Sequence, residues 1–506
     1  MAMQYLKSKI VGAIVENRLL LLLAAIVLIT YSILYPSAPK NCAYSDECGY
    51  VNSAYDISKH FVFNTRGYYF DSLLTQTPPL KRKHAPGFAA TLALFIKVFG
   101  AREKHLFLFN FIVLGFFIIF FYYFNNRYIS HNKELSFIVC AVFLSYPHIN
   151  LTNIMRESLV TVSTGLLIYL MFFYVPERKN LKSFIVCAVL FWYCYLVKEN
   201  VLFLLPGFVL IYLKEKDYEI ILKTTIALLI FYPVVHFITE NRMVYPYGFM
   251  YKLHNTEEFF DKLSLLFGNF YLNVTRIWDF NHTPLYLWMR ILFYQFSIFS
   301  LLSYPLLKKK QRYLYKVVML YFLINTFMIY LLYDNFSWRF LRSSIQFVPF
   351  HILFAVTGGY NILVSGKERY YKFIFYSVII ALMCECVYIN FHSRHSANIH
   401  KITFVKQERS KLNFLKKYID KDDAVNILTD IKSSRFLMEF PRSTITCLYG
   451  LKKFNSTSFN MVNRKIGFDY IFLTYRMKST IGFILDSGYK MTKDGNVYIL
   501  SRRKKS

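Results

Sequence analysis

Residues 105–124 read HLFLFNFIVLGFFIIFFYYF, a run of 20 residues without Lys, Arg, Asp or Glu. An α-helix of about 20 apolar residues spans the ~30 Å hydrocarbon core of a bilayer. Strands of a membrane barrel would instead alternate apolar and polar residues over about 10 positions. This stretch therefore predicts a transmembrane helix.

Apolar runs of similar length recur along the first 390 residues. The hydrophobic fraction of the chain is 55%, and its 52 Phe and 42 Tyr exceed what a soluble core uses. The first run, Leu19–Tyr35, follows a basic start and is expected to be an anchor rather than a cleaved signal. The sequence predicts an α-helical polytopic membrane protein with about eleven crossings, near residues 19–35, 105–124, 134–149, 157–174, 183–197, 200–213, 221–239, 284–306, 315–332, 339–364 and 371–390.

The distribution of Lys and Arg among the loops predicts the orientation. With the N-terminus inside, the inner loops carry more than twice as many basic residues as the shorter outer loops, as inner loops of membrane proteins do. The N-terminus is therefore expected in the cytoplasm, in an inner or plasma membrane. The net charge of +30 comes without a nucleic-acid-binding motif, so membrane lipids rather than nucleic acid are the expected partners.

Two long segments depart from the alternation of crossing and short loop. The outer loop 37–104 ends in FAATLALFIKVFG, which is short for a crossing and suits an interfacial helix. In residues 391–506, a helix near 407–419 precedes the strand-like AVNILT, STITCLY and FDYIFLTY, and a hairpin turns at Asp494 and Gly495. We predict a membrane domain over 1–390, which includes the outer loop, and a small soluble α/β domain over 391–506 on the outer face.

Charged residues gather on the predicted outer side. Asp46 and Glu47 follow the first crossing, and Glu157 begins the fourth. Sugar transfer from a lipid phosphate needs a base and positive charge to hold the departing phosphate, but no general acid, because phosphate is already a good leaving group. The candidate cations on the same side are Lys81, Arg82, Lys83, His84, Lys198, Arg339 and Arg342.

Each of these residues also has a plainer interpretation. Asp46 and Glu47 could be solvated loop acids, and Glu157 could only complement the dipole of its helix. The cations could anchor helix ends to lipid headgroups. Cys42 and Cys48 bracket the acidic pair, so a disulfide across this short loop and two free thiols both remain open.

The order of these motifs resembles the GT-C superfamily of polytopic glycosyltransferases. It resembles in particular the group of dolichyl-phosphate-mannose protein mannosyltransferases and bacterial aminoarabinose transferases (glycosyltransferase family 39-like). The resemblance covers roughly residues 1–390. Its motifs in chain order are DECGY after the first crossing, HAPGF, KVFG, RES, KEN and RFLRSSIQFVP.

The resemblance implies roles for individual residues. Asp46 would be the catalytic base, with Glu47 and Glu157 supporting it or positioning the acceptor. Lys83 or His84 would bind the donor phosphate together with Arg339, and the remaining candidates are Arg342 and Lys198. His84 stands where Lys or Arg is commoner in relatives, and the Cys bracket is not a general feature of the family.

The function expected from these features is an inverting glycosyltransferase of the cell envelope. It would move a sugar from a polyprenyl-phosphate-linked donor to a glycan, lipid or protein acceptor on the outer, periplasmic or lumenal, face. The scheme requires no cofactor, and a divalent metal is compatible with it but has no motif in its support. The alternatives are a transporter or flippase of lipid-linked sugars and a non-catalytic membrane scaffold.

Overall fold

The structure is a computed structural model of the 506-residue chain. Apart from single residues, it describes residues 45–61, 67–75, 77–78, 86–100, 103–146, 156–240, 256–275, 284–332, 344–363, 369–420, 423–430, 442–448 and 454–502. The chain divides into two compact units. The helical unit comprises Met1–Ala38, Leu106–Val235 and Lys252–Ile399, and the α/β unit comprises Pro39–His105, His236–Tyr251 and His400–Ser506.

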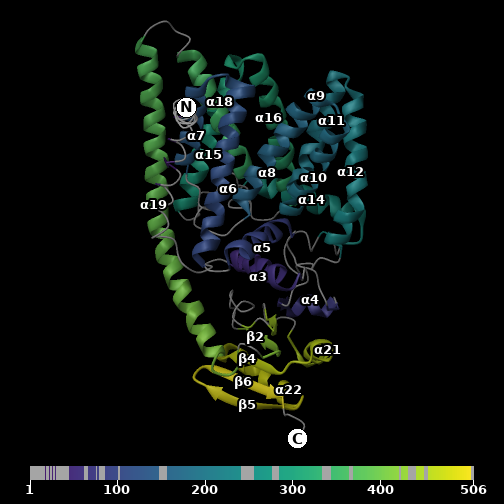
Figure 1. Ribbon diagram of the computed structural model, residues 1–506. Helices are drawn as coiled ribbons and strands as arrows, with labels where there is room; N and C mark the ends of the chain where they lie inside the picture. Colours follow the sequence, from purple (N-terminus) through teal and green to yellow (C-terminus); the bar gives the residue numbers. More distant parts are fainter. Residues whose placement is uncertain are drawn as a thin grey trace, which may run out of the picture. The chain divides into compact units, whose positions relative to one another are not determined.

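The helical unit is a bundle of consecutive helices (Figure 1). Every predicted crossing from residue 105 onward overlaps one of these helices, which confirms the α-helical polytopic fold. Five of the described helical segments are long and apolar enough to span a membrane: Leu108–Ser130, Glu157–Arg178, Tyr218–Thr239, Lys309–Leu332 and Tyr370–Ile389. The helices are α6 (Glu103–Phe124), α7 (Lys133–Ser145), α8 (Glu157–Tyr169), α9 (Val175–Arg178), α10 (Leu181–Val197), α11 (Leu204–Glu215), α12 (Tyr218–Thr239), α14 (Phe259–Thr275), α15 (Pro284–Ser303), α16 (Lys309–Leu332), α18 (Val348–Leu363) and part of α19 (Arg369–Leu415).

Two tight turns between helices use the same local chemistry. His131 and Lys179 adopt left-handed backbone conformations, with φ of 52° and 47°, after the preceding helices. An Asn follows each of them as the N-cap of the next helix. The Asn132 side chain accepts a hydrogen bond from the Leu135 N–H, and that of Asn180 accepts one from the Ser183 N–H. These caps end one helix and begin the next within two residues.

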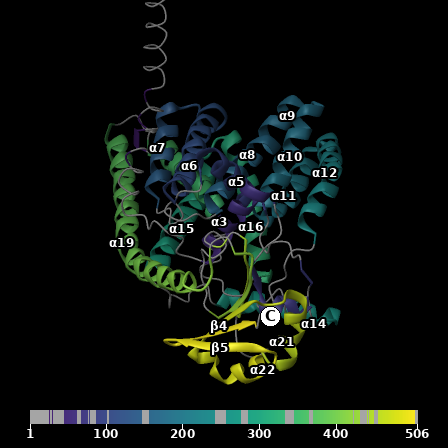
Figure 2. The same ribbon diagram turned by 60° about the horizontal axis from the view of Figure 1, so that its bottom comes forward.

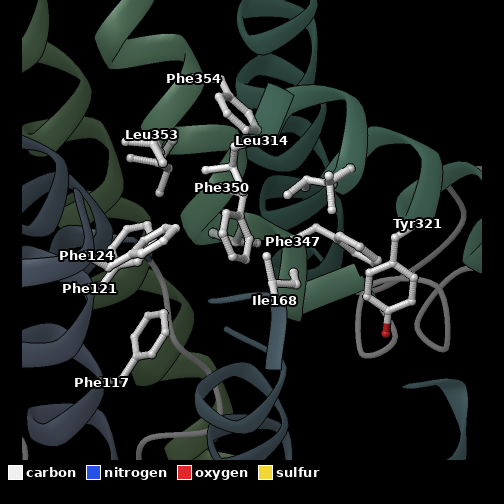
Figure 3. Packing of buried hydrophobic residues seen from close by; sticks show 14 of the residues in the cluster. Phe117, Phe121, Phe124, Ile168, Leu314, Tyr321, Phe347, Phe350, Leu353 and Phe354 are labelled. Carbon is white, nitrogen blue, oxygen red and sulfur yellow. The ribbon is translucent and has the colours of Figure 1, made fainter. Parts of the chain in front are cut away.

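The core of the helical unit is rich in aromatic side chains, and Figure 3 shows part of it. Phe117 stacks on Phe121 at 5.2 Å between ring centroids, and Phe121 meets Phe350 edge-on at 5.8 Å. All three side chains are buried. Such pairs add specific geometry to the burial of apolar area, so they fix how α6 and α18 pack.

Between the predicted crossings near 221–239 and 284–306, the chain forms the 17-residue helix α14. Asn269 and Asn273, one helical turn apart, are buried and donate to the Tyr330 carbonyl at 3.1 and 2.9 Å. Asn269 also donates to the Leu331 carbonyl at 3.0 Å. Carbonyls in the last turn of a helix lack partners within it, so α14 satisfies the end of α16.

The α/β unit is built on a six-stranded sheet with the order β1-β3-β2-β4-β6-β5. The first four strands in this order are parallel neighbours, while β6 and β5 form the antiparallel hairpin that the sequence predicts. The strands are β1 (Gly67–Tyr69), β2 (Asn426–Thr429), β3 (Thr444–Cys447), β4 (Tyr470–Thr474), β5 (Tyr489–Asp494) and β6 (Val497–Arg502). The sheet therefore takes its edge strand β1 from the long loop that follows the first predicted crossing.

Both faces of the sheet are covered. In β4, Ile471 and Leu473 belong to one buried cluster and Phe472 to another, because successive side chains point to opposite faces. The first cluster packs the sheet against the helices α4 (Phe70–Thr75), α21 (Ser456–Ile466) and α22 (Ile481–Leu485). The second includes Leu412 and Leu415 at the end of α19. Figure 2 shows the strands together with α21 and α22.

Two local features differ from the sequence-based expectations. The last predicted crossing ends at residue 390, but the helix α19 continues without a break from Arg369 to Leu415 (Figure 1). This stretch contains neither Pro nor Gly, the residues that most often end or kink a helix. The expected helix near 407–419 is the last part of α19 together with the turn that follows it.

The second difference concerns the acidic loop. Residues 45–60 form the helix α3 (Ser45–His60), so Asp46 and Glu47 lie in a helical first turn rather than in an irregular loop. Tyr50 of α3 meets Phe88 of α5 (Gly87–Phe99) edge-on at 5.0 Å, and both side chains are buried. Packing against α5 thus gives residues 45–60 a reason to be helical that the local sequence does not show.

Candidate functional site

Glu157 is the first residue of α8, as the sequence predicts, and its side chain is completely buried. Arg156 precedes it as the N-cap, with 16% of its side chain exposed. The next side chain, Ser158, donates to Oδ1 of the buried Asn110 at 3.0 Å, which links α8 to α6. A carboxylate at the beginning of a helix is stabilised by the helix dipole, yet complete burial is unusual for Glu.

Lys198 ends α10. Its backbone is extended, with φ −159° and ψ 127°, and its N–H closes the helix on the Cys194 carbonyl at 2.8 Å. Its side chain is only 7% exposed. Glu199 then begins a short 3-10 helix, Glu199–Phe203, that leads into α11. Because the backbone of Lys198 is extended, Lys198, Glu199 and Asn200 lie outside the regular helix α10.

Ion pairing joins these two chain segments. The Arg156 guanidinium lies 3.9 Å from the Glu199 carboxylate, so the beginning of α8 and the end of α10 lie together. The four charged residues here are two cations and two acids. Their charges interact more strongly in a poorly hydrated protein interior than in water.

Polar residues of α16 and of the turn before α18 extend the site. Asn200 Nδ2 donates to Asn325 Oδ1 at 3.1 Å, and the Tyr321 hydroxyl donates to the Asn200 carbonyl at 3.4 Å. Gln346 Nε2 donates to that hydroxyl at 3.0 Å. We call these residues the polar cluster, together with Glu157 and Lys198, the chain neighbours of Arg156 and Glu199; it consists of Asn110, Arg156, Glu157, Ser158, Lys198, Glu199, Asn200, Tyr321, Asn325 and Gln346.

Two further buried polar side chains escaped the sequence analysis. Arg290 of α15 is 2% exposed and interacts electrostatically with Tyr294 and Tyr330. Phe293, one helical turn after Arg290, meets the buried His351 of α18 edge-on at 5.5 Å. In the sequence, each of these residues appears as a lone Arg or His within an apolar run. Such a residue is a functional candidate, because ionisable residues at membrane depth are costly and often functional.

The structure describes only some of the predicted site residues. Asp46 and Glu47 occupy the second and third positions of α3, but their side chains and that of Cys48 lie outside the described part. The other predicted residues outside it are Cys42, Lys81, Arg82, Lys83, His84, Arg339 and Arg342. Of the predicted set, the structure describes the buried Glu157 and Lys198, whose chain neighbours Arg156 and Glu199 form the ion pair. Within the described residues, no group of three or more His, Cys, Asp or Glu side chains is arranged to hold a metal ion.

The comparisons with known proteins agree with this architecture. Residues 83–239, which include Glu157 and Lys198, match the family model described as dolichyl-phosphate-mannose-protein mannosyltransferase. No curated protein matches the sequence.

Solved structures give whole-chain similarities. ArnT from Cupriavidus metallidurans bound to undecaprenyl phosphate is similar with a TM-score of 0.57 and 9% identity, over 96% of this chain and 98% of that one. Its apo state gives a TM-score of 0.55 and 9% identity, over 95% and 97%. An oligosaccharyltransferase from Archaeoglobus fulgidus in complex with Zn and sulfate gives 0.53 and 9%, over 95% of this chain and 73% of that one. The family match over residues 83–239 and the similarity of fold confirm the predicted resemblance to GT-C glycosyltransferases and the fold of a polytopic membrane protein.

Proposed function

We propose that the protein transfers a sugar from a polyprenyl-phosphate-linked donor to an acceptor hydroxyl or amine. The observation that carries the proposal is the polar cluster, which buries Glu157 and Lys198 in an apolar helical bundle of this fold. Burying charged groups costs free energy, so an interior that holds several of them is a functional candidate. The undecaprenyl phosphate in the ArnT structure supports a polyprenyl phosphate as the carrier.

The proposed reaction is a direct displacement at the anomeric carbon. Asp46 removes the proton from the acceptor, whose oxygen or nitrogen then forms a bond to C1 of the sugar. The bond between C1 and the phosphate oxygen breaks, and polyprenyl phosphate leaves with the electron pair. One such displacement inverts the configuration at C1. Glu47 and Glu157 are proposed to position the acceptor and to support the base.

The departing phosphate requires positive charge. The candidates from the sequence are Lys83, His84, Lys198, Arg339 and Arg342, and we add Arg290. A guanidinium can donate two parallel hydrogen bonds to a phosphate and stays protonated when buried. Arg290 is nearly inaccessible and lies close enough to Tyr294 and Tyr330 to interact electrostatically with their hydroxyl groups. A buried Arg is suited to a ligand that itself enters from the membrane.

The location of the reaction is also part of the proposal. With the N-terminus in the cytoplasm of a cell with an inner or plasma membrane, Asp46 and the start of α8 would lie on the outer face. Nucleotide-activated sugars are cytoplasmic, so a site on that face needs a lipid-linked donor. Acceptors compatible with it are glycans, lipids and proteins.

The test is sugar transfer by purified protein in membranes that contain the lipid-linked donor. We expect Asp46→Asn to lower kcat by about 100-fold or more, because removing a general base costs 10²–10⁴-fold. Arg290→Met is expected to weaken donor use at least tenfold, through loss of one charge-assisted contact of about 1.5–3 kcal/mol. Two residues outside the polar cluster give matched controls: the partly exposed Asp217 as Asp217→Asn, which removes the ion pair with Lys179, and the exposed Arg312 as Arg312→Met.

Full transfer by Asp46→Asn would contradict its role as the base. A transporter or flippase would move the lipid-linked sugar across vesicles without changing the bond at C1. A scaffold would neither move nor cleave it. Mass spectrometry of the donor lipid and the acceptor distinguishes the three, since only a transferase converts the donor to polyprenyl phosphate.

A further inference from the structure

The segment that follows α10 is held at its third residue, Asn200, by the helix α16. The Tyr321 hydroxyl donates to the Asn200 carbonyl at 3.4 Å, and the Asn200 side chain donates to Oδ1 of Asn325 at 3.1 Å. Tyr321 and Asn325 are four residues apart in α16, so they lie on one face of this helix. One face of α16 therefore binds both the backbone and the side chain of Asn200.

Tyr321 is itself fixed by the short 3-10 helix Ile345–Phe347, which precedes α18. Gln346 donates to the Tyr321 hydroxyl at 3.0 Å, and the Phe347 ring meets the Tyr321 ring edge-on at 4.8 Å between centroids (Figure 3). All three side chains are buried. A buried side chain with both a ring contact and a hydrogen bond has little rotamer freedom, so the direction of the hydroxyl toward Asn200 is well defined.

Stability alone does not explain the contact between Asn200 and Asn325. Asn325 is fully buried, and its Nδ2 has no hydrogen-bond partner among the residues that the structure describes. A buried donor without a partner lowers stability, whereas a Leu of similar volume would bury no such group. An apolar residue at this position would therefore suit the packing of α16 better than Asn does.

The segment held by these contacts carries Lys198, a candidate for binding the donor phosphate. Lys198 is two residues before Asn200, its backbone is extended, and its side chain is 7% exposed. Its carbonyl accepts a long hydrogen bond, 3.4 Å, from the Val201 N–H. Because Lys198 has left the regular helix, the direction of its side chain depends on where the residues after it are held.

We infer that Tyr321 and Asn325 are positioning residues that hold Lys198, through Asn200, in the place where it contacts the phosphate of the lipid-linked donor. Gln346 supports them by fixing the Tyr321 hydroxyl. The inference rests on the proposed function, because Lys198 is there one of the cations proposed to bind the departing phosphate. The two positioning residues act on the affinity for the lipid carrier without touching the donor.

The experiment measures two properties of the purified full-length protein: the Kd for undecaprenyl phosphate, and amide hydrogen exchange of residues 198–203. We expect Asn325→Leu to raise both the Kd and the exchange rate about two- to tenfold, the effect of losing one hydrogen bond. The melting temperature of the ligand-free protein should not fall, because the variant also removes a buried donor without a partner. Tyr321→Phe, which removes only the hydroxyl, should change both properties in the same direction.

A double-mutant cycle tests whether Asn325 acts through Lys198. Lys198→Met alone should raise the Kd about tenfold or more, because it removes a charge-assisted contact with the phosphate. In the Lys198→Met protein, adding Asn325→Leu should change the Kd by less than about twofold, since residues that act through one contact are not additive. Additive effects of the two substitutions would overturn the inference.

Asn361→Leu is the matched control, because it makes the same substitution on α18 outside the polar cluster. Asn361 donates to the Leu306 carbonyl at 3.0 Å and to Gln311 Oε1 at 3.3 Å. The control should leave the Kd unchanged. An unchanged Kd in either Asn325→Leu or Lys198→Met would overturn the inference. The Kd needs no sugar transfer, so a failure of the proposed catalysis appears separately, as binding of the lipid phosphate without conversion of the donor.

Discussion

The two units are assembled from the chain in different ways. Most of the helical unit is a succession of neighbouring helices, with α6 to α12 following one another between residues 103 and 239. The α/β unit pairs strands from distant stretches, and its edge strand β1 lies more than 370 residues before its neighbour β3. Local patterns can therefore predict the first unit, whereas they can predict only parts of the second.

The surfaces of the two units differ as well. On α12, the large apolar side chains of Leu222, Leu229 and Phe237 are exposed, as expected for a helix that faces lipid. In the α/β unit the central strands bury both faces, and β5 at the edge exposes Lys490, Thr492 and Lys493. A charged edge strand limits pairing with other chains in water. The helical unit therefore presents apolar side chains suited to hydrocarbon, and the α/β unit presents charged side chains suited to water.

The largest predicted loss of stability tests whether the first long loop, residues 37–104, belongs to the core of the α/β unit. Leu73→Ala should lower the free energy of unfolding of that unit by about 2–5 kcal/mol, as Ile471→Ala should, because each removes a fully buried side chain. Thermal unfolding of the purified protein measures both. Leu485→Ala, at an exposed position in the same unit, is the control. If Leu73→Ala behaved like Leu485→Ala, the first loop would not be part of the core.

A smaller loss of stability is expected where α15 and α18 pack closely in the helical unit. A Cβ at Gly358 would collide with the Ser303 side chain and lie 3.0 Å from its Cα, so α15 and α18 would have to move apart. Gly358→Ala should destabilise the protein by about 1–3 kcal/mol. Gly115→Ala, where nothing lies within 4 Å, should stabilise it slightly. Equal melting temperatures for the two variants would show that α15 and α18 are not in close contact there.

The smallest effect is a pH dependence confined to the α/β unit. The Tyr418 hydroxyl donates to the Asp494 carboxylate at 2.6 Å and, with Lys417 at 3.4 Å, holds the pKa of that carboxyl below its usual value. A lowered pKa in the folded state gives stability that is present above the unfolded pKa of about 3.9 and is lost as the pH falls through the folded value. Asp494→Asn should therefore lower the melting temperature at pH 6 and have less effect near pH 3. Asp486→Asn, at an exposed position of the same unit, should show no such difference.

The sequence could predict those site residues that stand where a long apolar run meets charged residues. Glu157 and Lys198 stand at the ends of apolar runs, and the structure places them at the ends of α8 and α10. The ion pair between their chain neighbours Arg156 and Glu199 depends on how two helices pack, which neither run specifies alone. Arg290 and His351 were missed because one polar residue inside an apolar run carries no periodic signal.

By itself, the sequence determined the membrane-spanning helices, the strands of the tail and the order of motifs that resembles GT-C glycosyltransferases. These follow from residues close together in the chain, where hydrophobic periodicity and turn chemistry act directly. Only the tertiary structure decided that α19 runs on past residue 391, that residues 45–60 form a helix against α5, and that β1 completes the C-terminal sheet. The helix at residues 45–60 and the place of β1 depend on contacts between distant residues, whose free energy no local stretch contains.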